Sequence, residues 1–79
     1  MGKFPKDARR EDVLKALNMI GFNVVRNREH ISLTRTNRDG TKASMTIPNH
    51  RRIKSTTLKF ALMQAGVDRE DFLKAFALC

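Results

Sequence analysis

Residues 21–48 have the sequence GFNVVRNREHISLTRTNRDGTKASMTIP, which carries the clearest signal of the fold. Apolar and polar residues alternate along three parts of it, a pattern typical of strands that bury one face. The turn sequence Asn37-Arg38-Asp39-Gly40 separates the last two parts, and Asp-Gly readily forms the tight turn of a hairpin. The stretch therefore predicts three antiparallel strands. Their alternating positions are Phe22, Val24 and Arg26, then Ile31 and Leu33, then Ala43, Met45 and Ile47.

A helical pattern precedes this stretch. Apolar residues recur on one face from Val13 to Ile20, with acidic residues near the expected N-terminus of the helix. We therefore expect a helix over roughly residues 8–20. Asp7 is expected to cap its start, and Gly21 to end it.

Two further helices are expected after the strands. Ser55 or Thr56 is predicted to cap the first of them, which Gly66 ends, and Asp68 is predicted to cap the second. The resulting order is α-β-β-β-α with an additional C-terminal helix. This order predicts an α+β fold in which a three-stranded antiparallel sheet has helices on one face and water on the other.

The length of 79 residues predicts a single domain, residues 1–79 with a core over about 7–77. Cys79 has no partner for a disulfide within the chain, which fits a reducing compartment. The first residues lack the apolar segment of a signal peptide, and no apolar run approaches the length of a membrane span. We expect a cytoplasmic domain that does not bind membranes.

The charge is strongly positive and unevenly distributed. Sixteen Lys and Arg stand against eight Asp and Glu, which gives a net charge of +8. No acidic residue lies between Gly40 and Gly66, and a basic loop over residues 49–54 leads into the expected helix. A basic loop at a helix start suits phosphate, so nucleic acid is the first expected partner, before an anionic membrane or an acidic protein. A solvated basic face is the alternative. The residues concerned are His50, Arg51, Arg52 and Lys54.

The aromatic residues argue against reading of single-stranded bases. The chain has no Trp or Tyr, and its five Phe residues are expected in the core or at the terminus. Because such recognition depends on stacking platforms, recognition by shape and backbone is favoured.

His30 is the candidate for catalysis. The strand alternation directs it away from Ile31 and Leu33, toward the open face of the sheet. A histidine there can take a proton from a ribose 2′-hydroxyl or give one to a leaving 5′-oxygen, while Arg26 and Arg28 neutralise the phosphoryl oxygens. The alternative is a solvated strand residue without a catalytic role.

His50 and Glu29 carry weaker signals. His50 is interpreted as an RNA-binding residue, with a second acid or base and a plain loop residue as the alternatives. Glu29 is interpreted as a salt-bridge partner of a nearby arginine. The two histidines and Cys79 match no metal-ligand spacing, so neither a metal nor another cofactor is expected.

Taken together, several motifs resemble the HicA (YcfA-like) toxins. The resemblance extends over about residues 9–77 and depends on the order of its parts. These parts are Asp12-Val13-Leu14-Lys15-Ala16-Leu17, Gly21-Phe22-Asn23-Val24-Val25-Arg26, His30-Ile31, Asp39-Gly40, Ile47-Pro48-Asn49-His50, Lys54-Ser55-Thr56-Thr57-Leu58 and Gln64-Ala65-Gly66-Val67.

The resemblance implies a fold similar to a double-stranded-RNA-binding domain. It also implies a metal-independent endoribonuclease that acts on mRNA and is blocked by a HicB-type antitoxin. By position, the family's catalytic histidine corresponds to His30 and its Pro-x-His element to Pro48 and His50. The basic start of the following helix corresponds to Lys54 and Thr57.

The chain departs from the family pattern directly before His30. Many members carry Gly-Ser there, where a small pair lets the backbone approach phosphate, but this chain carries Arg28-Glu29. Arg28 can replace the backbone contact through its side chain, whereas Glu29 adds a charge of the same sign as RNA. Three hypotheses follow: a toxin ribonuclease, a non-catalytic RNA-binding module of the same fold, and a basic domain that binds an acidic protein partner.

Overall fold

The computed structural model describes residues 6–78 and confirms the α+β fold with its three-stranded antiparallel sheet and three helices. The expectations for the first residues and for Cys79 lie outside these residues. The elements are β1 (Asp7–Arg9), α1 (Arg10–Met19), β2 (Asn23–Asn27), β3 (His30–Thr36), β4 (Lys42–Pro48), β5 (Arg52–Lys54), α2 (Ser55–Gln64) and α3 (Arg69–Ala77).

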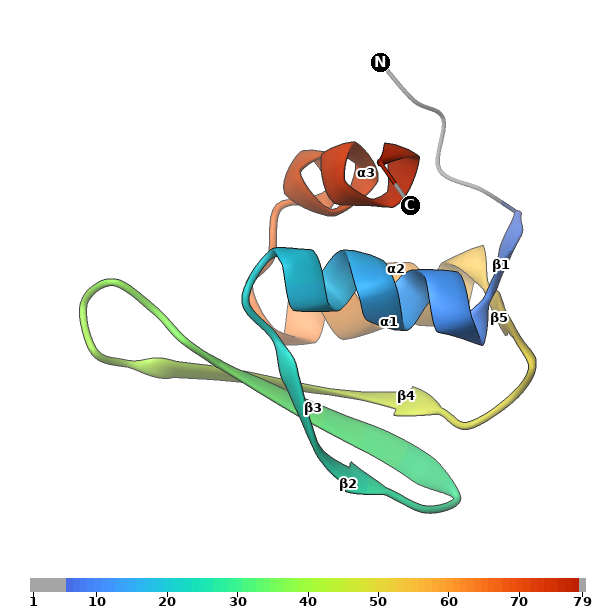
Figure 1. The fold of residues 1–79 in the computed structure, drawn as a ribbon, viewed down its shortest axis with the longest axis horizontal. Helices are drawn as coiled ribbons and strands as arrows, with labels where there is room; N and C mark the ends of the chain where they lie inside the picture. The colour runs from blue at the N-terminus through green and yellow to red at the C-terminus, as the bar shows by residue number, and fades with distance from the viewer. Residues whose placement is uncertain (1–5, 79) are drawn as a thin grey trace.

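The core lies between one face of the sheet β2-β3-β4 and the helices. β3 and β4 alternate as predicted, and their apolar side chains are buried while the neighbouring polar ones are exposed or half-buried. Figure 1 shows all three helices on one side of the sheet, with α3 farthest from it. The larger side chains with no exposed surface come from β3, β4, α1, α2 and α3: Ile31, Ile47, Val13, Leu17, Leu58, Leu62 and Phe72. Each such aliphatic side chain stabilises the fold by about 1.5–3 kcal/mol.

β2 departs from the predicted alternation. Val24 lies opposite Leu33 of β3, but Arg26 lies opposite Ser32, because the register shifts between Val24 and Arg26. Val25 is the extra residue of this β-bulge. Residues directly opposite each other share a face, so Arg26 lies on the open face with Ser32 and not on the face of Val24. The prediction that Phe22, Val24 and Arg26 share one face was therefore wrong.

A second, two-stranded sheet was not predicted. β1 and β5 pair antiparallel, and Ala8 opposite Ile53 is buried with it in the core. Residues 52–54 are therefore a strand, not part of a loop. Each of these strands has only three residues, too short for a readable alternation, and its partner lies far away in the chain.

This small sheet also explains why the predicted caps of the first two helices were wrong. α1 begins at Arg10 and α2 at Ser55, and neither has a side-chain cap. Instead, the N–H of Arg10 donates to the carbonyl of Arg51 (2.9 Å), and the N–H of Ser55 donates to the carbonyl of Lys6 (2.8 Å). The residue before β5 thus accepts from a free N–H at the start of α1, and the residue before β1 accepts from a free N–H at the start of α2.

Asp7, which was expected to cap α1, instead forms an ion pair with Arg52. Its Oδ1 accepts a hydrogen bond from Arg52 Nη1 at 2.9 Å. The other expected helix ends are confirmed. Gly21 and Gly66 take positive φ values of 101° and 70°. At α3, the Asp68 side chain accepts from the N–H of Glu70.

The β3–β4 turn is formed by the predicted residues. The N–H of Asn37 donates to the carbonyl of Thr41, and Gly40 takes a φ of 90°. Asp39 Oδ1 accepts from both the backbone N–H (3.0 Å) and the hydroxyl (2.6 Å) of Thr41. These hydrogen bonds lower the pKa of the Asp39 carboxyl, with the hydroxyl contributing most.

Candidate nucleic-acid interface

His30 begins β3 on the open face of the sheet. Its side chain is exposed, whereas Ile31 and Leu33 on the opposite face are buried. The Cα register places His30 opposite Pro48, the last residue of β4. His30 therefore lies at the end of the β3–β4 ladder, next to the segment that carries Asn49 and His50.

The bulge in β2 brings Arg26 to the same face as His30. Arg26 is exposed and lies opposite Ser32, two residues along β3 from His30. Such diagonal neighbours in an antiparallel pair are about 7–8 Å apart, within reach of a long side chain. Arg28, also exposed, lies in the turn directly before His30. Two arginines are therefore close to the histidine, Arg26 in the strand ladder and Arg28 in the chain.

Asn49 connects this turn to the rest of the molecule. Its Nδ2 donates to the carbonyl of Arg28 (2.7 Å) and to Oδ1 of Asn27 (3.1 Å), and its Oδ1 accepts from Arg10 Nη1 (2.6 Å). Its backbone N–H donates to the carbonyl of Glu29 at 3.1 Å. Sequence reasoning missed Asn49, because nothing in the pattern of the Pro-x-His element distinguishes its middle residue.

The remaining predicted cations follow directly in the chain. His50 and Arg51 are exposed in the segment between β4 and β5, and Arg52 and Lys54 are exposed on β5. The β2–β3 turn, this segment and β5 lie on the same side of the view in Figure 1. Arg52 and Lys54 belong to the small sheet, so the structure does not bring them into the sheet that carries His30.

Most of the positive charges in the candidate interface are not paired with carboxylates. Among residues 6–78, the ion pairs are Arg52 with Asp7 and Arg9 with Glu11, both exposed. Exposed pairs of this kind contribute only about 0–1 kcal/mol. Arg26, Arg28, Arg51 and Lys54 have no carboxylate partner in the described part of the chain. Their charges are therefore available to phosphate groups.

Glu29 does not form the predicted salt bridge within the described residues. Within residues 6–78, no ion pair includes its carboxylate. Its carbonyl oxygen accepts a hydrogen bond from the N–H of Asn49. The exposed carboxylate therefore lies uncompensated between Arg28 and His30 in the chain.

Not every cation belongs to this interface. Arg35 Nη1 donates to the carbonyl of Ile20, and its Nε donates to Oδ1 of Asn37, each at 3.2 Å. Its guanidinium lies 4.8 Å from the centre of the Phe22 ring, a cation–π arrangement. Arg35 therefore has a structural role at the end of α1.

One aromatic side chain departs from expectation. Phe22 and Phe72 are buried and Phe76 is half-buried, but Phe60 on α2 is 66% exposed. The prediction that all five Phe residues lie in the core or at the terminus was wrong for Phe60. It belongs to a helix on the covered side of the sheet, so among the described residues no aromatic side chain forms a stacking platform on the open face around His30.

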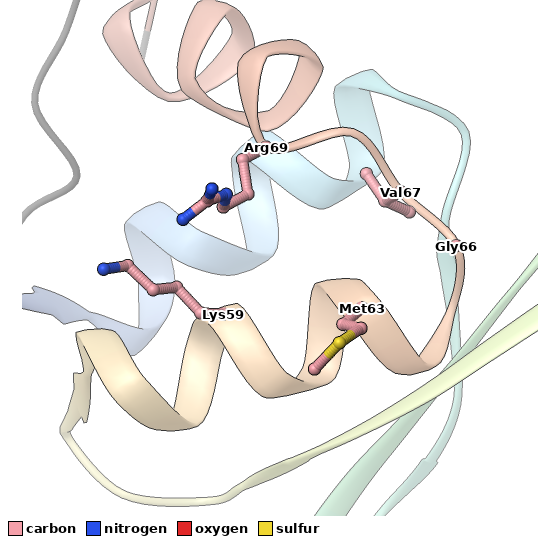
Figure 2. A pocket seen from close by; sticks show the side chains of 5 residues that line it. All are labelled: Lys59, Met63, Gly66, Val67 and Arg69. Atoms are coloured by element: carbon pink, nitrogen blue, oxygen red, sulfur yellow. The ribbon is translucent and has the colours of Figure 1, made fainter.

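A shallow hollow of about 520 Å³ lies between α2 and α3, away from the predicted residues. Figure 2 shows that Lys59 and Arg69 extend toward the same side of it, with Met63 and Val67 as its apolar lining. None of the predicted site residues lines this hollow. Over residues 6–78, no group of three or more His, Cys, Asp or Glu side chains could hold a metal ion.

Comparison with protein families defines the class of the chain. The model of the family described as "HicA toxin of bacterial toxin-antitoxin" matches residues 10–67. This chain belongs to that family, as its motifs predicted. It is thus a toxin of a toxin–antitoxin system, and its partner in that system is an antitoxin. No curated protein and no solved structure matches the chain. Within the described residues, the helices are too short or too polar to cross a membrane.

Proposed function

We propose that this toxin is a metal-independent endoribonuclease that cleaves mRNA in the cytoplasm, with His30 as its catalytic residue. The observation that carries the proposal is an exposed histidine on an open sheet face, near Arg26 in the ladder and Arg28 in the chain, neither of which has a carboxylate partner within residues 6–78. Membership of the HicA family supports the toxin role. We further propose that its antitoxin is of the HicB type.

The reaction uses the RNA's own nucleophile. The 2′-oxygen attacks the adjacent phosphorus, the O2′–P bond forms, and the P–O5′ bond breaks. One proton leaves the 2′-hydroxyl and one proton reaches the departing 5′-oxygen; His30 serves one of these transfers as general base or general acid, and water serves the other. The products are a 2′,3′-cyclic phosphate and a 5′-hydroxyl, so no metal, oxidant or other cofactor is required.

The arginines stabilise the charge of the reacting phosphate. Negative charge grows on its non-bridging oxygens as the 2′-oxygen attacks, and a guanidinium offers paired donors that fit two such oxygens. Arg26 and Arg28 carry out this role next to His30. His50, Arg51, Arg52 and Lys54 hold phosphates farther along the RNA. Phosphate contacts of this kind position RNA without reading its bases.

The exposed Glu29 favours a second function, a non-catalytic RNA-binding module of the same fold. Its carboxylate has no ion-pair partner within residues 6–78 and stands where many members of the family that the chain resembles carry a small residue. A like charge beside the substrate weakens phosphate binding at the reacting position more than elsewhere. This function predicts RNA affinity with strong salt dependence and no cleavage.

Expression in a bacterial host tests the toxin function. We expect the parent protein to arrest growth and to shorten reporter mRNA, which primer extension detects as new 5′ ends. His30→Ala should accumulate to the same level, leave growth unchanged and produce no new ends. His50→Ala should retain part of the activity, because His50 is proposed to bind and not to react. Equal growth arrest by His30→Ala would refute the assignment of His30.

A further inference from the structure

We propose that Asn49 is the positioning residue of the site, which fixes the 27–30 turn and thereby the place of Arg28 and His30. This inference rests on the proposed role of His30. It assigns a function to an uncharged side chain that is neither the proposed catalytic group nor one of the proposed phosphate-binding residues. The hydrogen bonds of Asn49 to two separate segments of the chain, the β2–β3 turn and the start of α1, carry the inference.

Both N–H groups of the Asn49 side-chain amide donate to the turn. Nδ2 has two hydrogens, and both have acceptors, the carbonyl of Arg28 at 2.7 Å and Oδ1 of Asn27 at 3.1 Å. The backbone N–H of Asn49 reaches the next carbonyl, that of Glu29, at 3.1 Å. Three donors of one residue therefore hold three consecutive residues of the turn.

The opposite side of the amide is anchored to a helix. Oδ1 of Asn49 accepts from Arg10 Nη1 at 2.6 Å, a charge-assisted hydrogen bond. Arg10 is half-buried and is the first residue of α1, and its backbone N–H is bound to the carbonyl of Arg51. Because only the oxygen can accept from Arg10, the orientation of the amide is determined, and Nδ2 must face the turn.

The turn needs such support because it has little of its own. Arg28 and Glu29 are both exposed, and the backbone hydrogen bond within the turn runs from the Arg28 N–H to the carbonyl of His30 at 3.2 Å. The small residues that the family carries there would let the backbone itself approach phosphate. With two long charged side chains instead, the position of the turn depends on Asn49.

Positioning has a kinetic signature. A misplacement of about 1 Å can cost about 100-fold in rate, whereas affinity for a long RNA depends on many phosphate contacts. Loss of the Asn49 side chain should therefore lower kcat and leave KM nearly unchanged. An RNA-binding residue would show the reverse.

Four variants and the parent test this inference. Asn49→Ala removes all side-chain bonds, and Asn49→Asp keeps the acceptor for Arg10 but cannot donate to the turn. Asn23→Ala removes an exposed asparagine at the other end of β2 that has no side-chain bond in the described structure, and serves as the matched control. His30→Ala is the catalytic control. Cleavage of a long RNA gives kcat and KM, and hydrogen exchange reports the amides of Arg28 and Asn49.

Both Asn49 variants should lose about 10- to 100-fold in kcat, with KM within about twofold of the parent. Exchange at the two amides should accelerate about five- to tenfold in Asn49→Ala, which corresponds to one or two lost hydrogen bonds. Asn23→Ala should match the parent in both measurements. Parental kcat in either Asn49 variant, or a rise in KM without a fall in kcat, would overturn the inference.

The two assays separate this inference from the proposed function. If the parent and His30→Ala cut equally, the role of His30 fails, whatever the exchange rates are. If the parent alone cuts and exchange at the turn is unchanged in Asn49→Ala, the proposed function stands and the positioning role fails. Accelerated exchange with a fall in kcat supports both.

Discussion

Arg26 lies opposite Ser32 in the β2–β3 ladder, one residue out of step with Val24 opposite Leu33. The extra residue, Val25, rotates the end of β2 and transfers Arg26 from the covered face to the open face. The same open face carries His30, so a single-residue bulge supplies one of the two guanidinium groups beside the candidate catalytic residue. β-Bulges are common next to active sites for this reason.

Arg26→Ala should therefore weaken RNA binding without unfolding the protein. We expect affinity at low salt to fall about three- to tenfold, and the slope of log K against log salt to decrease in magnitude by about 0.7 for single-stranded RNA. Arg69→Ala removes the same charge from α3 and should change affinity less. A salt titration by fluorescence anisotropy measures both. An unchanged slope in Arg26→Ala would contradict the proposed phosphate contact.

Glu29→Gln tests the effect of the uncompensated carboxylate. The substitution keeps the shape of the side chain and removes a negative charge beside the proposed phosphate site, so RNA affinity should rise about two- to fivefold. Glu70→Gln on α3 is the control for net charge alone. If both variants bind RNA equally well, Glu29 does not lie near the bound phosphates.

Ile53→Ala tests whether β5 belongs to the core. Ile53 is 1% exposed between two exposed basic residues. Truncation of a fully buried isoleucine costs about 2–5 kcal/mol of unfolding free energy, a large part of the stability of a small domain. Lys54→Ala, on the neighbouring exposed position, should stay within about 0.5 kcal/mol of the parent. Equal urea midpoints for the two variants would mean that β5 does not pack as described.

The β3–β4 turn should lose stability in acid. The Thr41 hydroxyl lowers the pKa of Asp39 below its ordinary value of 3.8. A lowered pKa in the folded state stabilises the fold above the ordinary pKa, and this contribution disappears as the pH falls through the lowered value. Thr41→Val removes the hydroxyl donor and keeps the backbone donor, so the pKa of Asp39 should return partway toward 3.8. A carboxyl titration by NMR measures it, and an unchanged pKa would contradict the described contact.

The sequence predicted the elements whose signal is local. β3 and β4 alternate over seven residues each, and α3 carries its own cap in Asp68, so these elements could be read directly. β1 and β5 could not, because three residues give no readable period and their pairing joins distant parts of the chain. The caps predicted at Asp7 and Ser55 or Thr56 failed for the same reason, since backbone carbonyls of the distant strand occupy that role.

The charged residues of the candidate site could be predicted from the sequence, but the strand register and the hydrogen bonds that position them could not. The exposure of His30 follows from two buried neighbours, Ile31 and Leu33. By contrast, the bulge at Val25 depends on pairing with β3, and the role of Asn49 depends on three segments that meet only in the folded chain. An asparagine in a basic loop carries no sequence signal for such a role.

We propose that the protein cleaves RNA through the RNA's own 2′-hydroxyl, with His30 as the general base or acid. The most direct measurement is cleavage of a long RNA in the presence of a chelator by the parent and by His30→Ala, with chemical identification of the fragment ends. We expect that only the parent cuts, and that its fragments end in a 2′,3′-cyclic phosphate or a 3′-phosphate and begin with a 5′-hydroxyl. Fragments with 3′-hydroxyl and 5′-phosphate ends, or equal cutting by His30→Ala, would contradict it.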